Sequence, residues 1–341
     1  METGRPISPG VGDGLEQVVS TATSIEWTKS DDGTAGATWN PVTGCDEVSE
    51  GCDHCYARTF AERWRGIPGH HFEHGFDVTL RPERLDQPLR WKRPKRIFVN
   101  SMSDLFHDEV PDEFIAQVFT VMALAPQHTF QLLTKRHGRM RSLLASGEKW
   151  RGLLHETAAW AAGLGLPVPA ERFDELRRWI SSEGHWMRAT SHSPEVAPLA
   201  NVWLGVSAEN QKWFDIRVPA LLATPAAVRF VSCEPLLGWV DMAFDHECGD
   251  PPHSCCPPVP DWVIVGGESG PGARRMELEW ARGIVRQCRR SGIAPFVKQL
   301  GAVAGRDLGA GPKGGDWDCW PGDLKVREFP HVFVPPGADV D

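Results

Sequence analysis

The sequence predicts an α/β fold in which parallel strands form a full or partial (βα) barrel of the TIM type. Six short apolar runs, rich in β-branched and aromatic residues, are typical of buried strands. Helix-like stretches alternate with them, which is the pattern of parallel βα units. Every run also ends in polar residues, and strand ends carry the chemistry of such barrels. The runs are 96–104, 129–135, 201–207, 228–235, 261–268 and 295–299.

The intervening stretches have the apolar spacing of amphipathic helices. Residues 111–124 begin with Pro111 and Asp112, a typical helix start, and residues 280–290 repeat the pattern after the fifth run. Residues 57–64 also begin like a helix. The apolar face of the 111–124 stretch consists of Phe114, Ile115, Val118, Phe119 and Met122.

The chain is organised as one barrel domain over residues 23–334, with polar tails at 1–22 and 335–341. Residues 142–199 are too long for one crossover, so we expect two or three extra helices there, covering the barrel mouth. Residues 245–260 form a loop insertion rich in cysteine, histidine and proline. The histidines and cysteines between 246 and 256 are zinc-ligand types, so this loop is either a second zinc site or an irregular loop whose thiols have no role.

Composition excludes a membrane-spanning protein and a secreted disulfide scaffold. No apolar run reaches the roughly 18 residues of a membrane helix, and the N-terminus lacks the pattern of a signal peptide. Nine cysteines are an odd number, which argues against a complete set of disulfides. We therefore expect a cytoplasmic protein without a membrane partner.

The net charge of −9 does not indicate nucleic-acid binding by the protein as a whole. Two local stretches, 81–96 and 135–141, are nevertheless rich in arginine and lysine. They predict either contacts to the phosphates of DNA or RNA or ordinary solvated faces.

Three cysteines, Cys45, Cys52 and Cys55, form a C-x6-C-x2-C loop. Three thiolates suit a 4Fe-4S cluster that keeps one iron free for a small molecule, which is how S-adenosylmethionine (SAM) is held and cleaved. The alternative is a structural zinc site, which needs a fourth ligand. The histidines close enough in sequence to supply it are His54, His70, His71 and His74.

Taken together, these motifs resemble a phage and bacterial family of unassigned function, the three-Cys-motif family, which is regarded as radical-SAM-like. The resemblance covers about residues 23–142 and 200–334. The pattern is more distantly similar to spore photoproduct lyase, which shares the T-G-C…C-x-x-C-Y loop and a strand-end Thr-Lys. The usual radical SAM loop is C-x3-C-x2-C, so the first gap differs here. The motifs are IEWT at 25–28, TWNPVTGC at 38–45, GCDHCYA at 51–57, VNSMSDLFH at 99–107, LTKR at 133–136, NVWLGVS at 201–207, EPLLG at 234–238, VGGESGPG at 265–272, KQ at 298–299 and DLKVREFP at 323–330.

The resemblance implies a barrel of the radical SAM type with definite residue roles. Cys45, Cys52 and Cys55 would ligate the 4Fe-4S cluster. Cys233 would donate a hydrogen atom inside the barrel, and Glu234 would bind a polar substrate. Residues expected to bind the cofactor are Tyr56 beside the cluster, Asn100, Ser101, Ser103 and Asp104 near the methionine amino group, Lys135 at the methionine carboxylate, Thr134 and Ser207 at strand ends, and Glu268 at the ribose or at a polar substrate.

Three functions follow as hypotheses. The first is a radical SAM enzyme that forms a 5′-deoxyadenosyl radical, with a nucleobase in DNA or RNA as the substrate for repair or modification. It would need a reductant such as flavodoxin or ferredoxin. The second is a zinc-bearing nucleic-acid-binding protein without catalysis. The third is an iron–sulfur scaffold or sensor that works with a partner protein, as members of the resembled family are thought to do.

Overall fold

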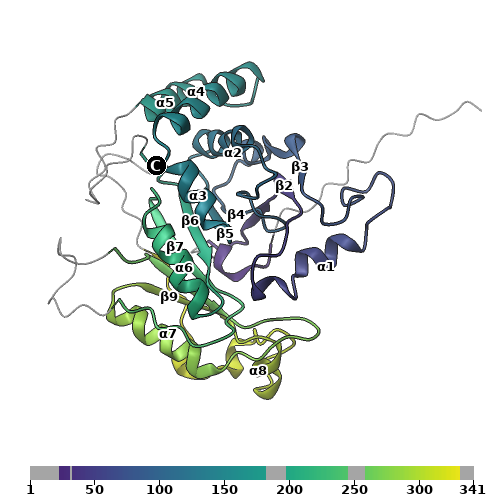
Figure 1. Ribbon diagram of the computed structural model, residues 1–341, viewed down its shortest axis with the longest axis vertical. Coiled ribbons are helices and arrows are strands. Elements are labelled where there is room, and N and C mark those ends of the chain that lie inside the picture. The colour runs from purple at the N-terminus through teal and green to yellow at the C-terminus, as the bar shows by residue number, and fades with distance from the viewer. Residues whose placement is uncertain (1–22, 31–32, 182–196, 245–257, 331–341) are drawn as a thin grey trace, which may run out of the picture.

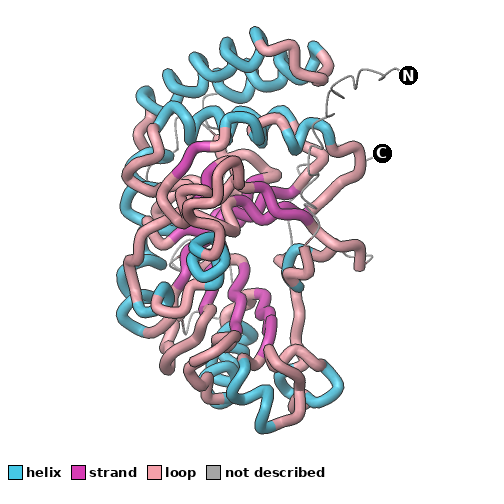
Figure 2. The backbone as a smooth tube through the Cα atoms, turned by 90° about the vertical axis from the view of Figure 1, so that its right-hand side faces the viewer, coloured by secondary structure: helices cyan, strands magenta, loops and turns pink. Residues whose placement is uncertain are grey.

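A curled sheet of seven parallel strands forms half of a barrel, which confirms the predicted α/β class and the partial barrel. The computed structural model describes residues 23–30, 33–181, 197–244 and 258–330. The strands lie in the order of the chain, and Figure 2 shows them together in magenta. Because each crossover advances by one strand, the helices stay on one face and the sheet curls around the other. The strands are β1 (Ala37–Trp39), β4 (Arg96–Val99), β5 (Thr129–Thr134), β6 (Val202–Ser207), β7 (Val228–Cys233), β8 (Trp262–Gly266) and β9 (Ala294–Gln299).

All six predicted runs contain a strand. β4, β7 and β8 stop before the polar residues that end the run, whereas β5, β6 and β9 extend to Thr134, Ser207 and Gln299. The predicted helices at 111–124 and 280–290 correspond to α2 (Asp112–Leu124) and α7 (Leu278–Arg290). The helix start at 57 corresponds to α1 (Tyr56–Glu62). The remaining helices outside the insertion are α3 (His137–Leu144), α6 (Gln211–Leu222) and the short α8 (Ala302–Asp307) (Figure 1).

The insertion after α3 does not cover the barrel mouth in its described part. Its helices α4 (Glu148–Gly163) and α5 (Ala170–Ser181) pack on α2 and form a further layer outside the half-barrel (Figure 1). Trp150 and Leu154 of α4 join the core that contains Phe119 of α2, so the insertion buries its apolar face against the helix layer. The predicted tails at 1–22 and 335–341, residues 182–196, and the proposed zinc ligands at 246–256 lie outside the described residues.

Large aromatic side chains fill the concave face of the sheet. Trp203, Phe230, Trp262 and Phe296 form one buried cluster, separate from the core under the helices. Trp27, in the short helix η1 (Glu26–Thr28), packs into this cluster with Trp262 and Phe230. The inside of the half-barrel is therefore a packed and mainly apolar core, in which the buried Gln131 of β5 donates a hydrogen bond to the Trp27 carbonyl.

A C-terminal segment covers one edge of the sheet. Residues 326–328 run antiparallel to β9, and hydrogen bonds join Val297 N–H to Val326 O and Glu328 N–H to Pro295 O. Arg327 donates to the carbonyls of Val297 and Lys298. An edge paired in this way is protected from association with other strands.

A small two-stranded ribbon leads into the cysteine loop. It pairs β2 (Val42–Thr43) with β3 (Thr79–Leu80) in antiparallel register. An isolated parallel bridge joins Gly44 to Ser103, just beyond β4. Among the described residues no helix combines the length and the apolar character needed to cross a bilayer.

Candidate functional site

The cysteine loop, residues 45–55, lies over the carboxyl ends of the strands. Cys45 follows β2, Cys52 ends the short helix η2 (Glu50–Cys52), and Cys55 caps α1. All three are free and half-buried. Gly44, with φ of 89°, lets the chain pass against Asp77, where a Cβ would lie 2.2 Å from the Asp77 carbonyl oxygen. A side chain is therefore excluded immediately before the first cysteine.

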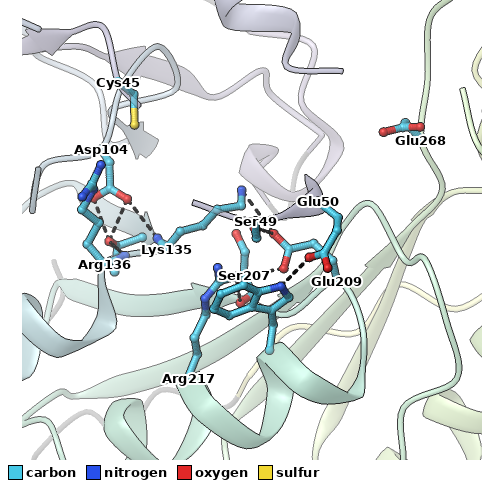
Figure 3. A network of polar contacts seen from close by, with 12 residues as sticks. Cys45, Ser49, Glu50, Asp104, Lys135, Arg136, Ser207, Glu209, Arg217 and Glu268 are labelled. Carbon is cyan, nitrogen blue, oxygen red and sulfur yellow. Dashed lines mark hydrogen bonds and ion pairs between the residues drawn. The ribbon is translucent and has the colours of Figure 1, made fainter. Parts of the chain in front are cut away.

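One buried carboxylate, at the end of β6, anchors the Cys52 side of the loop. Glu209 Oε2 lies 2.8 Å from Arg217 Nη1, and both residues are 0% exposed. Ser49 donates a hydrogen bond of 2.8 Å to Glu209 Oε1 (Figure 3). A Cβ at Gly51 would lie only 2.3 Å from the same oxygen, so the loop backbone rests directly on the carboxylate. We call Glu209, Arg217 and Ser49 the Glu209 clamp.

The tryptophan at the start of α6 reinforces this clamp. Trp213 Nε1 donates a hydrogen bond of 2.6 Å to Glu50 Oε2, which lowers the pKa of Glu50. The Arg217 guanidinium lies 4.1 Å from the centre of the Trp213 ring. Nε and Nη2 of Arg217 are buried without a hydrogen-bond partner among the described residues, so the ring face is the main compensation for their lost hydration.

A second carboxylate, after β8, anchors the other side. Glu268 is 2.6 Å from Arg274 Nη2 and 2.9 Å from His54 Nδ1. Arg274 also donates to Glu50 O at 2.8 Å and pairs with Asp53 at 2.9 Å. Burial alone would raise the pKa of Glu268, but the hydrogen bonds from Arg274 and His54 outweigh it and lower the pKa to about 2. We call Glu268, Arg274 and His54 the Glu268 clamp. Its carboxylate holds the loop, so it is not open to the ribose as predicted.

Asp104 joins the ends of β4 and β5. Thr134 Oγ1 donates to its carboxylate, 2.7 Å and 2.9 Å from the two oxygens, and Lys135 N–H donates at 2.9 Å. Phe106 N–H supplies a further bond of 3.0 Å. The predicted ammonium acceptor is therefore already satisfied by its own chain, and so is Thr134.

The neighbouring serines are also engaged internally. Ser103 donates to Val42 O at 2.7 Å, and Ser101 Oγ bonds with the Asn40 side chain at 3.2 Å. Asn100 differs, because its amide is buried, 3% exposed, with neither side-chain atom hydrogen-bonded among the described residues. Its φ of 61° is tolerated by asparagine more readily than by most side chains.

The Lys135 side chain is attached more loosely than those of Asp104, Thr134 and Ser103. Its Nζ lies 3.6 Å from Glu209 Oε1, beyond hydrogen-bond distance, and points across the strand ends towards the Glu209 clamp (Figure 3). Burial and the nearby Asp104 raise the pKa of the Cys45 thiol to about 12, while Arg136 and Lys135 oppose this rise. A thiolate at Cys45 therefore needs more positive charge than these two side chains supply.

Tyr56 and Glu234 lie near one another on the other side of the loop. The Tyr56 residue is 62% exposed, yet burial of its hydroxyl raises the pKa, with Cys55 and Glu234 adding to the effect. Its hydroxyl donates a bond of 2.7 Å to Ser101 O. Glu234 Oε1 pairs with Lys298 Nζ at 2.5 Å, so a strand-end ion pair stands close to the only tyrosine of the chain.

The prediction that Cys233 faces the barrel interior is wrong. Side chains alternate along β7, and Phe230 belongs to the concave cluster while Val231 and Cys233 belong to the core under the helices. Cys233 is fully buried there, which raises the pKa of its thiol to about 12. Ser207 ends β6 almost fully buried, and its carbonyl accepts a bond from Arg217.

The two basic stretches are largely engaged within the chain. In the 81–96 stretch, Arg81 bonds with Thr43 and the His71 carbonyl, and Arg96 lies over Phe329. In the 135–141 stretch, Arg136 pairs with Asp108 and Arg139 with Asp112. The exposed cations that these stretches leave are Lys92, Arg93 and Arg141.

The described residues contain one group of three potential metal ligands within 4.8 Å of one another, namely Asp46, His107 and Glu109. His107 Nδ1 accepts a hydrogen bond from Glu109 N–H, so its Nε2 carries the proton and donates to Asp46 at 3.2 Å. Both ring nitrogens are thus engaged in hydrogen bonds within this loop. This group therefore serves to fold the loop after β4.

The three cysteine sulfurs are spaced more widely than a zinc ion requires. They do not form a group within 4.8 Å in the described residues, with or without a histidine. Zn–S bonds of roughly 2.3 Å would hold tetrahedral sulfurs about 3.8 Å apart. Of the four histidines expected as a fourth ligand, His54 is held by Glu268, and His70 and His71 stack on Trp64 and Phe72.

Sequence reasoning missed the arginines that complete the two clamps. Glu209 lies two residues after the end of β6, where a polar residue indicates a candidate site, although it was not chosen as a site residue. Arg217 and Arg274 stand eight and six residues after their carboxylates, a separation without a recognisable motif. A groove of 590 Å³ between α3 and α6, lined by residues such as Arg141 and Ile216, is separate from this constellation.

Comparisons with known proteins identify a family but no activity. A family profile described as "Protein of unknown function (DUF5131)" matches residues 22–320. No curated protein matches the chain, and no solved structure matches it.

Proposed function

The chain belongs to DUF5131, a family of proteins of unknown function, and we propose that it is a radical SAM enzyme with its cofactor at the cysteine loop. The observation that carries the proposal is that three free cysteines of one loop lie over the strand ends of a partial barrel. The motif resemblance to the three-Cys-motif family and to spore photoproduct lyase supports the same assignment.

The donor set fits a 4Fe-4S cluster held by Cys45, Cys52 and Cys55. When bound with SAM, this cluster supplies one electron that cleaves the sulfonium to methionine and a 5′-deoxyadenosyl radical. A positive inorganic core also meets the need for charge at Cys45, whose thiol is otherwise held neutral by burial.

Side chains of the protein would bind and orient the cofactor and the substrate. Lys135 is loosely held at 3.6 Å from Glu209, so it can turn to a carboxylate of the cofactor. Tyr56 offers an exposed ring face beside Cys55, with its hydroxyl fixed on Ser101 O. The Glu234–Lys298 pair is partly exposed and offers one acceptor and one donor to a polar substrate. A nucleobase in DNA or RNA has the planarity and polar edges for these groups.

The test is anaerobic reconstitution with iron and sulfide, followed by measurement of iron, acid-labile sulfide and zinc. We expect close to four irons and four sulfides per chain. Reduction in the presence of SAM should then release 5′-deoxyadenosine, measured by chromatography and mass spectrometry.

Cysteine variants give the control. Cys52→Ala should lose the cluster and the nucleoside product, whereas Cys319→Ala, a free half-buried cysteine outside the loop, should keep both. Zinc alone in the reconstituted protein would overturn the proposal. An intact cluster without 5′-deoxyadenosine would leave an iron–sulfur scaffold and remove the radical activity.

A further inference from the structure

The outer helix α7 has a polar face rich in arginine. It carries Arg282, Arg286, Arg289 and Arg290 against a single acidic residue, Glu279. Arg282 pairs with Asp323 and Glu279. Arg286 and Arg289 are exposed and form no ion pair with the described residues. In a chain of net charge −9, this is a local surface of the opposite sign.

An exposed tryptophan from another segment of the chain packs against the same helix. Trp239 follows β7 and is 48% exposed. A Cβ at Gly283 would lie 2.4 Å from Cη2 and 2.5 Å from Cζ3 of the Trp239 ring, so the indole rests directly on the helix backbone. Gln287 holds the following segment along the helix, through its bonds with Val240 O at 3.0 Å and Met242 N–H at 2.7 Å.

Gly283 is the position on α7 that allows the Trp239 ring to approach the helix. A glycine inside a helix costs about 0.5–1 kcal/mol relative to alanine. Here the glycine lets the ring lie directly against the helix backbone, while about half of the ring stays in water. One face of the indole is fixed against α7, and about half of its surface is left for a ligand.

We propose that Trp239, Arg286 and Arg289 form a contact surface for single-stranded nucleic acid. A fixed exposed aromatic ring stacks on unpaired bases, and adjacent arginines bind the phosphates. Arg286 is three residues from Gly283, so the position that seats the ring and the position that carries this arginine are neighbours on the surface of α7. A duplex offers no free base face, which is why a single strand fits this surface better. The choice of a nucleic acid rests on the proposed function, but the surface lies apart from the cysteine loop.

The experiment measures binding of fluorescein-labelled single-stranded DNA and RNA, each about 12 nucleotides long, by anisotropy over a range of salt. The full chain is used without added iron, so the result does not depend on the cluster. Loss of one stacked base in Trp239→Ala should weaken binding by about 5- to 150-fold. Arg286→Ala combined with Arg289→Ala should reduce the slope of log K against log salt by about 1.4.

Two further variants make the test specific. Gly283→Ala should unseat the Trp239 ring and weaken binding, although alanine favours the helix. Arg172→Ala combined with Arg177→Ala removes the same charge from the exposed face of α5 and should leave binding unchanged.

Several outcomes would overturn the inference. These are equal loss in the α5 variant, unchanged binding in Trp239→Ala, no binding of either strand, or binding of poly-glutamate with neither nucleic acid. The last result would assign the surface to an acidic protein. Failure here would leave the cluster chemistry intact, and failure to form a cluster would leave this binding measurable.

Discussion

The two clamps hold one loop at different depths. Glu209 and Arg217 are both inaccessible to water, and their ion pair meets the loop through the hydrogen bond from Ser49 and the contact with Gly51. Glu268 is nearly as deep and bonds with His54 of the loop, but its partner Arg274 is about one third exposed and reaches the loop through two surface contacts. The first clamp is therefore an internal ion pair on which the loop rests, and the second is a partly hydrated strap across it.

This difference predicts different sensitivities. Inside the protein, a charge whose partner has been removed has no water to replace it, whereas near the surface water and salt supply most of the compensation. Damage to the Glu209 clamp should therefore affect global stability. Damage to the Glu268 clamp should depend on pH and ionic strength.

The largest effect is expected for Glu209→Gln, which leaves the buried Arg217 charge without its partner. Breaking a buried ion pair on one side costs about 3–5 kcal/mol, so the free energy of unfolding in urea should fall by that amount. The amide keeps an acceptor for Ser49, so the loss belongs to the charge.

The control for this prediction is Glu209→Gln combined with Arg217→Met, which removes both charges and should regain most of the stability. If the double variant is as unstable as the single one, the buried pair is not the source of the loss, and the contrast between the clamps disappears.

The next effect is the pH dependence of the Glu268 clamp. The folded pKa of about 2 lies below the unfolded value of 4.5, so the clamp stabilises the protein above pH 4.5 and loses this contribution as the pH falls towards 2. A shift of this size corresponds to about 3 kcal/mol. Urea unfolding of wild type and Glu268→Gln should therefore differ by that amount near neutral pH and converge at about pH 2. A constant difference over this range would contradict the assignment.

The clamps also show which features of the fold and of the candidate site can be predicted from the sequence. Strand positions were predictable, because each buried run contrasts with the polar residues that follow it. β1 was missed, since its three residues are too few to show a pattern. The inward or outward direction of side chains was not predictable. In β7 both faces are apolar, so nothing in the run places Phe230 inside and Cys233 outside.

Polar residues at strand ends were found, but their partners were not. Asp104 was predicted to face a ligand and instead accepts from Thr134 and two backbone amides. Glu268 was predicted to bind a ribose and instead meets Arg274. Sequence spacing places such side chains at one edge of the sheet, whereas the choice between ligand and neighbour depends on loop conformations that follow from long-range packing.

A smaller effect is expected for Gly51→Ala, which tests whether the loop rests on the Glu209 clamp. The new Cβ would lie 2.3 Å from Glu209 Oε1 in a buried site, so the loop must shift, at a cost of about 1–3 kcal/mol. In iron-free protein, the rate of alkylation of Cys52 relative to that of Cys45 should increase, and mass spectrometry measures both rates. Gly138→Ala is the matched control, because its Cβ would have nothing within 4 Å. Equal alkylation ratios in both variants would show that the loop does not depend on this contact.

The smallest effect separates the clamps by their response to salt. Asp53→Asn removes the ion pair with Arg274 at 2.9 Å, in which the Asp53 side chain is 51% exposed, so the cost should be about 0–1 kcal/mol. Raising the salt concentration to about 1 M shortens the screening length to about 3 Å and should abolish this cost. Ser49→Ala removes a hydrogen bond to the buried Glu209, and its cost of about 1 kcal/mol should persist at high salt, because no ions enter that site. Urea unfolding of the two variants at low and high salt measures the contrast. If the Ser49 variant also recovers in salt, the Glu209 clamp is hydrated, and the two clamps do not differ in depth.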